Sequence, residues 1–277
     1  MSKKAIGFMD SGVGGLTVAK LAIQELQNEN IAYLGDEARL PYGEKSKEEI
    51  QQYTLQIANF LIKKEDIKML VIACNTATSY ALSYLQEHLL IPVIGVVNPG
   101  SIAAVNNTKT NRVGLIATNG TVKSGAYEKE IKKINNDVEV FSQGCPRFVP
   151  MVENQEFKDS KTQIVVDNDL STINKDDVDT LILGCTHFPI MSDLIQKSVG
   201  DNVKLIDPGH ETVKQIKKIL QDNHIENNEV SKPTYSFYTT GDPDNFNNVA
   251  NEWLNFEVHA KHLPIKKLEE LRLWKQL

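Results

Sequence analysis

The chain contains little cysteine and no long apolar segment. Its 277 residues include three cysteines, an odd number that excludes a complete set of disulfides. No apolar run approaches the roughly 20 residues that a transmembrane helix needs, and the first residues lack the apolar core of a secretory signal. These absences predict a cytoplasmic protein with free thiols and no membrane partner.

An excess of positive charge is also missing. The formal net charge is -6, which argues against a basic face that binds nucleic acid. The proportions of hydrophobic residues, 41%, and charged residues, 24%, are those of an ordinary globular protein. The length suits one large domain or two ordinary ones.

Short β-branched runs alternate with longer helical segments along most of the chain. The expected strands are residues 5–9, 31–34, 69–73, 93–97, 113–117, 138–141, 180–183 and 203–206. The expected helices include residues 16–26, 47–63, 77–89, 124–134 and 212–221. This alternation indicates an α/β protein whose parallel sheets are covered by helices on both faces. The tail, residues 261–277, is expected to be an exposed amphipathic helix.

The second half of the chain weakly repeats the first. Three pairs of similar segments occur in the same order, each pair separated by about 110 residues, a spacing too long for a solenoid. The pairs surround Ser11 and Thr118, Cys74 and Cys185, and Pro99 and Pro208. Any α/β protein offers some matches between strand ends, which is the alternative interpretation. We favour a duplication, because the cysteine and Pro-Gly matches do not depend on hydrophobic pattern.

The two Pro-Gly pairs follow expected strands and are read as turns. We interpret them as crossings between two domains, residues 1–98 plus 209–277 and residues 99–208. The predicted fold is therefore two similar parallel-sheet α/β domains related by pseudo-twofold symmetry. Such a pair favours an active site in the interdomain cleft.

Cys74 ends an apolar run and precedes a polar segment. A single cysteine in such a place is more often a small buried hydrophobe than a reactive group. However, Asn75 and Thr76 can cap a helix that starts near residue 77. A thiol at the positive end of a helix dipole has a lowered pKa. This setting predicts a functional thiol.

Cys185 has a similar setting. Thr186 and His187 precede Pro189, and proline is favoured in the first turn of a helix. His187 also offers a titratable partner close to the thiol. Two thiols that face one substrate can move a proton from one side of a carbon to the other. The third cysteine, Cys145, lacks such a neighbourhood and is expected to be structural.

A glycine-rich segment, Asp10-Ser11-Gly12-Val13-Gly14-Gly15, follows the first expected strand. Its spacing matches neither a dinucleotide fingerprint nor a P-loop. Its N–H groups could bind an anion, or its glycines could serve a tight turn, and both interpretations stay open. Asp10 is expected at the carboxyl end of a central strand, where open α/β sheets place ligands.

Further polar residues follow later strands. Tyr42 and Gly43 could present a hydroxyl and an N–H to a ligand, whereas Arg39 and Asp36 could simply pair with each other. Glu153 follows an apolar run, and surface exposure is its default interpretation.

A metal site is the sharpest alternative for the cysteines. Zinc sites usually contain closely spaced ligand pairs. The ligands here would have to assemble from separate loops, namely Asp10, Cys74, Cys185 and His187. We therefore expect no metal.

Four segments together resemble bacterial glutamate racemase. They are DSGVGGLT (residues 10–17), GDEARLPYG (35–43), ACNTAT (73–78) and GCTHFP (184–189), in the family's order over nearly the whole chain. The wider aspartate/glutamate racemase superfamily shares only the two cysteines and the two-domain plan. The resemblance implies a cofactor-independent homodimer that interconverts L- and D-glutamate and supplies D-glutamate for peptidoglycan synthesis.

The resemblance also implies roles for individual residues. Cys74 as thiolate would take the Cα proton from D-glutamate while Cys185 protonates the opposite face, and the roles would reverse for L-glutamate. The positions that match helpers of the thiols are Asp10, Glu153 and His187. The positions that match substrate-binding residues are Asp10, Ser11, Tyr42, Gly43, Asn75, Thr76, Thr118, Thr121, Thr186 and His187.

Three positions depart from the family's commonest pattern: Glu37, Asn98 and Phe188. None of these departures removes a catalytic group. The competing functions are a racemase of aspartate or another amino acid, an amino-acid-binding protein without turnover, and a zinc-binding regulator.

Overall fold

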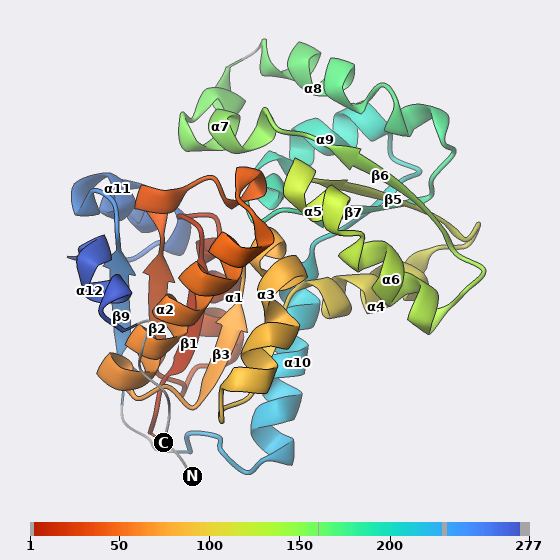
Figure 1. Cartoon of the computed structure of the whole chain (residues 1–277). Helices are drawn as coiled ribbons and strands as arrows, with labels where there is room; N and C mark the ends of the chain where they lie inside the picture. Colours follow the sequence, from red (N-terminus) through yellow and green to blue (C-terminus); the bar gives the residue numbers. More distant parts are fainter. Residues whose placement is uncertain (1–2, 160, 229–231, 272–277) are drawn as a thin grey trace.

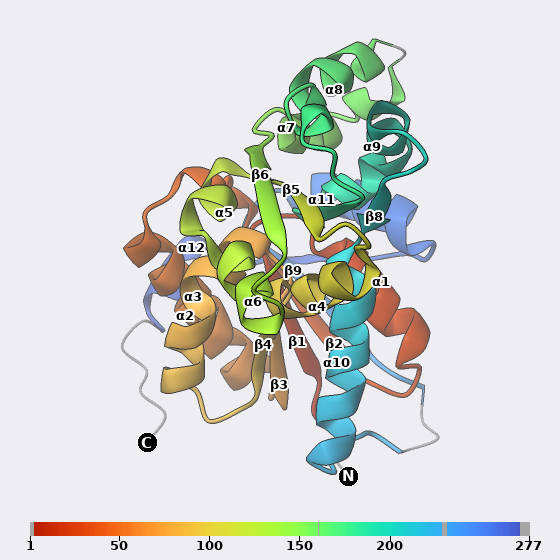
Figure 2. The same ribbon diagram turned by 90° about the vertical axis from the view of Figure 1, so that its right-hand side faces the viewer.

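The computed structural model describes residues 3–159, 161–228 and 232–271. Within these residues the strands form two parallel sheets, each covered by helices (Figures 1 and 2). The first sheet has the strand order β10-β9-β2-β1-β3-β4, and the second has the order β6-β5-β7-β8. The predicted α/β fold with parallel sheets is confirmed, and the exact domain boundaries stay a prediction.

The elements alternate along the chain. The first sheet contains β1 (Ile6–Asp10), β2 (Ile31–Gly35), β3 (Met69–Ile72), β4 (Val93–Gly95), β9 (Tyr235–Thr239) and β10 (Lys261–His262). The second contains β5 (Arg112–Ala117), β6 (Glu139–Gly144), β7 (Thr180–Gly184) and β8 (Lys204–Ile206). The α-helices are α1 (Leu16–Glu25), α2 (Lys47–Glu65), α3 (Asn75–His88), α4 (Val97–Asn107), α5 (Asn119–Ser124), α6 (Ala126–Ile134), α7 (Phe148–Glu153), α8 (Thr162–Leu170), α9 (Ser192–Val199), α10 (Pro208–Asp222), α11 (Pro243–Leu254) and α12 (Ile265–Glu269). The 3-10 helices are η1 (Glu37–Arg39), η2 (Tyr42–Glu44), η3 (Glu156–Lys158), η4 (Ile173–Lys175) and η5 (Phe188–Met191).

The first sheet divides its core in two, because alternate side chains of a strand point to opposite faces. Ile6 and Phe8 pack in one cluster with residues of α1, α10 and α11. Met9 packs in another with residues of α2, α3 and α12. All residues of β1 and β2 are buried, as expected for a parallel sheet covered on both faces.

Helices α4 and α10 carry the chain between the two sheets. They lie against each other (Figure 2), and a Cβ added to Gly100 of α4 would lie 2.9 Å from Pro208 Cγ of α10. The two Pro-Gly pairs therefore lie in the first turns of helices, and their prediction as loop turns is wrong. Proline fits a first turn because its missing N–H would have no partner inside the helix.

Several predicted elements differ in the structure. The strand predicted over 93–97 ends at Gly95, because Val97 already belongs to α4. Strand β9 is absent from the sequence prediction. The prediction of an exposed helix over 261–277 is wrong, since Lys261–His262 form β10 and α12 buries Leu268; residues 272–277 lie outside the described residues. Over the described ranges, none of the helices is both long and apolar enough to cross a membrane.

Candidate active site

Most of the predicted site residues meet between the two sheets, at the carboxyl ends of the strands. Asp10 ends β1, Cys74 follows β3 and Cys185 follows β7. The two thiols line one small cavity of about 20 Å³. Its lining comprises Ser11, Leu40, Pro41, Tyr42, Gly43, Cys74, Asn75, Thr76, Thr118, Val149, Cys185, Thr186 and His187. The three remaining predicted residues, Asp10, Thr121 and Glu153, hydrogen-bond to residues of this lining.

Cys74 itself caps helix α3. Its Sγ accepts a hydrogen bond from the N–H of Ala77 at 3.4 Å and donates to Ser11 Oγ at 3.7 Å. The predicted capping by Asn75 and Thr76 is therefore wrong, because these residues are the first two of the helix. The side chain that caps the first N–H groups of α3, which have no partner inside the helix, is therefore the Cys74 thiol.

The pKa of Cys74 is shifted in the direction opposite to the sequence prediction. Burial raises the pKa of this thiol well above its ordinary value, and the charge of Asp10 raises it further. The hydrogen bonds that Ala77 and Ser11 can donate to the thiolate act in the opposite direction but are outweighed. The prediction of a lowered pKa is wrong because the helix terminus does not compensate for the loss of water.

Cys185 is the first member of a buried chain of polar groups. Its Sγ lies 3.7 Å from Nδ1 of His187, and Nε2 of His187 lies 2.5 Å from Oε1 of Glu153. Burial lowers the pKa of His187, but the hydrogen bonds to Cys185 and Glu153 outweigh it and raise the pKa well above its ordinary value. The default interpretation of Glu153 as a surface residue is wrong, since its side chain is only 21% exposed. Cys185 precedes the 3-10 helix η5, not an α-helix.

Asp10 lies at the centre of the glycine-rich segment. Its Oδ2 accepts hydrogen bonds from the N–H groups of Gly12 and Gly15 at 3.2 and 3.0 Å, and its Oδ1 accepts from Thr186 Oγ1 at 3.5 Å. Two N–H groups of the segment thus bind the protein's own carboxylate. Burial raises the pKa of Asp10 to about 6, although His187 and the two N–H groups lower it.

Gly14 allows the glycine-rich segment to approach the Cys185 loop closely. A Cβ added there would lie 2.4 Å from Thr186 Oγ1 and 2.6 Å from two ring atoms of His187. Real Cβ atoms do not approach other atoms so closely. The glycine is therefore required for this contact between the segments that follow β1 and β7.

Three threonine hydroxyls join the halves of the site. Thr76 stands two residues after Cys74. Its Oγ1 lies 2.9 Å from Thr118 Oγ1 and 3.1 Å from Thr121 Oγ1. The Thr118 and Thr121 hydroxyls are themselves 3.1 Å apart. Thr76 belongs to α3 beside the first sheet, and the other two lie after β5 of the second.

Tyr42 and Gly43 reach the site in different ways. The Tyr42 hydroxyl donates to Asp36 Oδ2 at 2.5 Å, so it is held by a buried carboxylate. Arg39 Nε also binds this oxygen at 2.7 Å, which agrees with the predicted pairing of Arg39 with Asp36. A Cβ on Gly43 would lie 3.0 Å from Thr118 Cβ. Gly43 thus brings its backbone against the second half of the site.

The sequence interpretation missed three apolar residues of the lining, Leu40, Pro41 and Val149. Leu40 and Pro41 stand inside a recognised motif, and their place in the chain could have indicated them. Val149 lies in α7, whose apolar run carries no chemical signal. Cys145, predicted to be structural, is fully buried in the apolar cluster beneath α7, α8 and α9.

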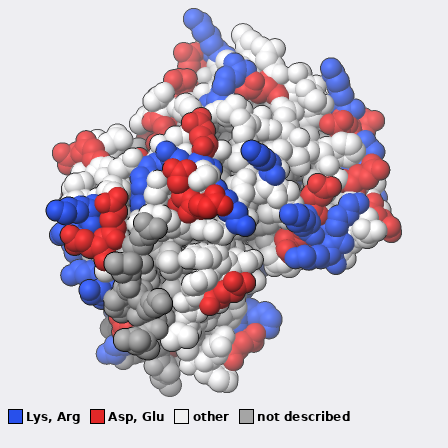
Figure 3. Space-filling view, viewed as in Figure 1, with Lys and Arg blue, Asp and Glu red and all other residues white. Residues whose placement is uncertain are grey.

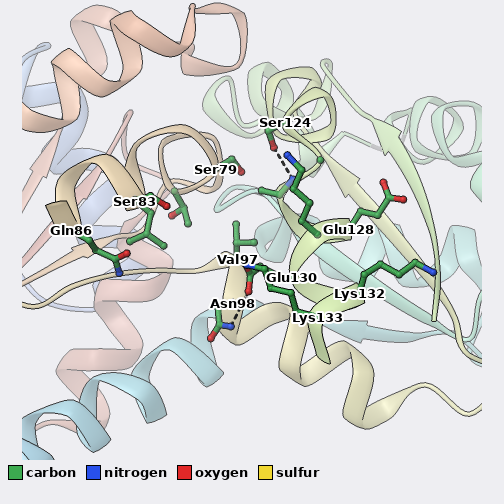
Figure 4. A pocket seen from close by; sticks show the side chains of 15 residues that line it. Ser79, Ser83, Gln86, Val97, Asn98, Ser124, Glu128, Glu130, Lys132 and Lys133 are labelled. Carbon is green, nitrogen blue, oxygen red and sulfur yellow. Dashed lines mark hydrogen bonds and ion pairs between the residues drawn. The ribbon is translucent and has the colours of Figure 1, made fainter. Parts of the chain in front are cut away.

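A much larger pocket of about 1000 Å³ lies elsewhere, between α3, α4 and α6 (Figure 4). None of the predicted site residues lines it. Asn98 Nδ2 donates to Glu130 Oε2 at 3.3 Å there, and Glu130 also pairs with Lys133. The two thiols line the smaller cavity and not this pocket.

Charged side chains of both signs are interspersed on the face shown in Figure 3. Within the described part of the chain, no group of three or more His, Cys, Asp or Glu side chains is arranged to hold a metal ion. All three cysteines are free.

Comparison with known proteins identifies the family. Residues 10–216 match the family described as Asp/Glu/Hydantoin racemase. A glutamate racemase of Lactiplantibacillus plantarum is 47% identical over 95% of this chain and 97% of its own length. A crystal structure of a Bacillus anthracis glutamate racemase superposes with a TM-score of 0.92 at 40% identity, covering 96% of this chain and 99% of the other.

A second solved structure contains a ligand. The glutamate racemase of Francisella tularensis in complex with D-glutamate has a TM-score of 0.88 and 38% identity, over 96% of this chain and 99% of the other. The aspartate racemase of Picrophilus torridus, at 19% identity and a TM-score of 0.56, shares the fold. The chain belongs to the Asp/Glu/hydantoin racemase family and, within it, to the glutamate racemases.

Proposed function

We propose that this protein interconverts L- and D-glutamate by a two-base mechanism that needs no cofactor. The observation that carries the proposal is the pair of thiols, Cys74 and Cys185, lining one cavity between two sheets. Its relatives match this chain over nearly their whole length and are named glutamate racemases, which supports glutamate as the substrate.

Each thiol serves one enantiomer as base and the other as acid. With D-glutamate, the Cys74 thiolate takes the Cα proton, and the electron pair of the C–H bond stays on the substrate. The Cys185 thiol then gives its proton to the opposite face of the carbon. L-glutamate leaves behind a Cys74 thiol and a Cys185 thiolate, which is the state that starts the reverse reaction.

The surroundings of the thiols suit a weakly acidic Cα–H bond. A base is stronger when the pKa of its conjugate acid is high, so the burial that raises the pKa of Cys74 strengthens its thiolate once formed. The raised pKa of His187 keeps a proton on the imidazole beside Cys185. That positive charge lies 3.7 Å from the Cys185 sulfur, and Glu153 holds the ring in place.

The substrate carboxylates need several donors, which the lining offers as hydroxyl, amide and backbone N–H groups. The residues proposed to bind them are Ser11, Tyr42, Gly43, Asn75, Thr76, Thr118, Thr121, Thr186 and His187. The hydroxyl of Tyr42 is engaged by Asp36, so Tyr42 would take part through its backbone N–H. The cavity of about 20 Å³ has room for about one water molecule. Glutamate therefore requires the halves to part before it binds, and their return excludes water from the reacting carbon.

We further propose that residues 1–98 plus 209–277 and residues 99–208 form the two domains. The D-glutamate produced would supply peptidoglycan synthesis in the cytoplasm, and the protein would act as a homodimer. Sedimentation velocity of the purified chain tests the last point, with a single species of twice the chain mass as the expected result.

Solvent isotope exchange tests the reaction directly. In D₂O, each glutamate enantiomer should yield the other, with deuterium at Cα of the product. Circular dichroism with aspartate as substrate should show no turnover, which separates the proposal from an aspartate racemase. Recovery of undeuterated glutamate of unchanged handedness after long incubation would instead indicate a protein that binds glutamate without turnover.

The Cys74→Ala variant tests the division of roles. Racemisation should be lost, while Cys185 still deprotonates a β-chlorinated L-glutamate, which then expels chloride and forms a carbon–carbon double bond. Cys145→Ala, which changes a buried thiol outside the cavity, should still racemise glutamate. If Cys74→Ala racemised at nearly the wild-type rate, the two-thiol mechanism would be wrong.

A further inference from the structure

Tyr127 is a buried tyrosine of α6 whose hydroxyl reaches the first turn of α3, beside the other sheet. The residue is 1% exposed, and its ring belongs to the apolar cluster beneath the second sheet. Its hydroxyl donates a hydrogen bond of 2.6 Å to Oδ1 of Asn75. Asn75 directly follows Cys74 and lines the cavity.

This hydrogen bond determines which end of the Asn75 amide is available to a ligand. A carboxamide has one acceptor oxygen and a nitrogen with two N–H donors. Tyr127 occupies the oxygen, and no described residue accepts a hydrogen bond from Nδ2 of Asn75. Two free N–H donors at the wall of a cavity suit a carboxylate.

The phenol of Tyr127 is a permanent donor. Burial raises its pKa far above the ordinary value, and the charges of Asp207 and Cys185 raise it further. The hydroxyl therefore keeps its proton throughout the pH range of an enzyme. A donor that never ionises fixes Asn75 in one amide orientation, because the flipped amide would offer N–H groups where an acceptor is needed.

The ring of Tyr127 lies where the two connections between the sheets meet. A Cβ added to Gly100 of α4 would lie 3.3 Å from Tyr127 Cε1 and 2.9 Å from Pro208 Cγ of α10. The glycine thus leaves room for both neighbours. The hydrogen bond to Asn75 consequently joins the first turn of α3, directly after Cys74, to the place where α4 and α10 cross between the two halves.

We propose that Tyr127 is a positioning residue, which holds Oδ1 of Asn75 and so turns the amide N–H₂ group toward a carboxylate of the substrate. The proposal rests on the proposed function and deepens it. Because Tyr127 and Asn75 belong to different halves, the amide is oriented only while the halves have the arrangement described here. Binding of the carboxylate is thereby coupled to closure of the site.

Tyr127→Phe is the test, because it removes one hydroxyl and retains the ring. Asn75 binds the carboxylate in the ground state and in the transition state alike, so its loss of orientation acts on KM. We expect KM for both glutamate enantiomers to rise roughly three- to ten-fold, the effect of one lost hydrogen bond, with kcat changed less than about two-fold. Tyr238→Phe, which removes a partly buried hydroxyl of β9 bonded to Glu65 of α2 and outside the cavity lining, should leave both constants unchanged.

A double-mutant cycle separates positioning from a structural role. If Tyr127 acts through Asn75, adding Tyr127→Phe to Asn75→Ala should change KM no further. Effects that multiply in the double variant, or a wild-type KM in Tyr127→Phe, would overturn the proposal. If Tyr127→Phe does not fold, Asn75→Asp replaces it: the oxygen for Tyr127 is retained and the N–H₂ donors are lost, so a wild-type KM there would overturn the proposal too. A wild-type protein without racemase activity would instead refute the proposed function.

Discussion

The carboxylate of Asp10 is fully buried, and the three donors around it do not fully replace water. Its pKa is raised from 3.8 to about 6, so the folded protein holds a proton there more firmly than the unfolded chain does. The resulting contribution to stability is complete below about pH 3.8 and is lost as the pH rises through about 6. At neutral pH the ionised carboxylate therefore destabilises the fold.

Asp10→Asn should remove this pH dependence. Relative to the variant, the wild-type protein should lose up to about 3 kcal/mol of unfolding free energy between pH 4 and pH 7. Urea denaturation at the two pH values measures the difference. If the unfolding free energies of the two proteins changed by the same amount between the two pH values, Asp10 would not titrate in this range.

His187→Gln tests whether the imidazole serves Cys185. It should lower kcat/KM about 100-fold, and by the same factor for both enantiomers, because enantiomers have equal free energies. The asymmetry should appear in isotope effects instead. In the proposed mechanism Cys185 takes the Cα proton of L-glutamate, so deuterium at Cα should slow the reaction of L-glutamate more strongly in the variant than in the wild type.

Isotope effects on D-glutamate provide the control for His187→Gln. They should change little, since the proposed mechanism transfers the Cα proton of D-glutamate to Cys74. A selective increase with D-glutamate would assign His187 to the other thiol.

The sequence could indicate residues only where a recognisable motif marks them. Cys74, Cys185 and the polar residues beside them stand in such motifs, and the structure places them around one cavity. Tyr127 stands in an ordinary amphipathic helix, so nothing in the sequence distinguishes it from a core tyrosine. The direction of the Cys74 pKa shift could not be predicted either, because it depends on burial by segments distant in the chain.

Among the structural elements, the glycine-rich segment between β1 and α1 packs very closely against the loop that follows β7. Gly14→Ala should push the Thr186–His187 loop away, since the added Cβ would overlap both side chains. We expect at least a 100-fold loss of kcat/KM, because small displacements of catalytic groups are costly. Steady-state racemisation together with thermal denaturation measures the effect.

Gly200→Ala is the matched control for Gly14→Ala. Gly200 has a positive φ of 83° and nothing within 4 Å of an added Cβ. The substitution should cost about 1 kcal/mol of stability through backbone strain and leave kcat/KM unchanged. Equal losses of activity in both variants would show that Gly14 acts only through stability.

Elements with clear periodicity could be predicted, and those with short or mixed patterns could not. The strands around Ile6, Val71 and Leu181 stand out as apolar runs. Strand β9, with the sequence YSFYT, is half polar, and its place between β2 and β10 depends on pairing across most of the chain. The tail prediction failed for the same reason, because Leu268 finds its core only in the folded protein.

For the molecule as a whole, the small volume of the cavity has a kinetic consequence. Cys74 and Cys185 are 5% and 7% exposed, so we expect a reagent such as iodoacetamide to reach them only through the proposed parting of the two halves. D-glutamate at ten times its Kd should slow their alkylation about ten-fold, because a ligand that binds the closed form reduces the open population. Mass spectrometry of the three cysteine peptides gives each rate.

Cys145 is the internal control for the alkylation experiment. It is fully buried in the core of the second sheet's half, so it should react only when that half unfolds. Alkylation of all three cysteines at one rate would mean that the thiols become accessible by unfolding and not by opening of the site.

The position of β9 bears on how the chain is synthesised. The strands of the second sheet lie between Arg112 and Ile206 and are all translated before β9. Strand β2, in contrast, leaves the ribosome early, and its outer edge finds its partner only when Tyr235–Thr239 has emerged. An unpaired strand edge invites association with other chains. The outer edge of β2 is therefore open to association with other chains for as long as Tyr235–Thr239 has not been made.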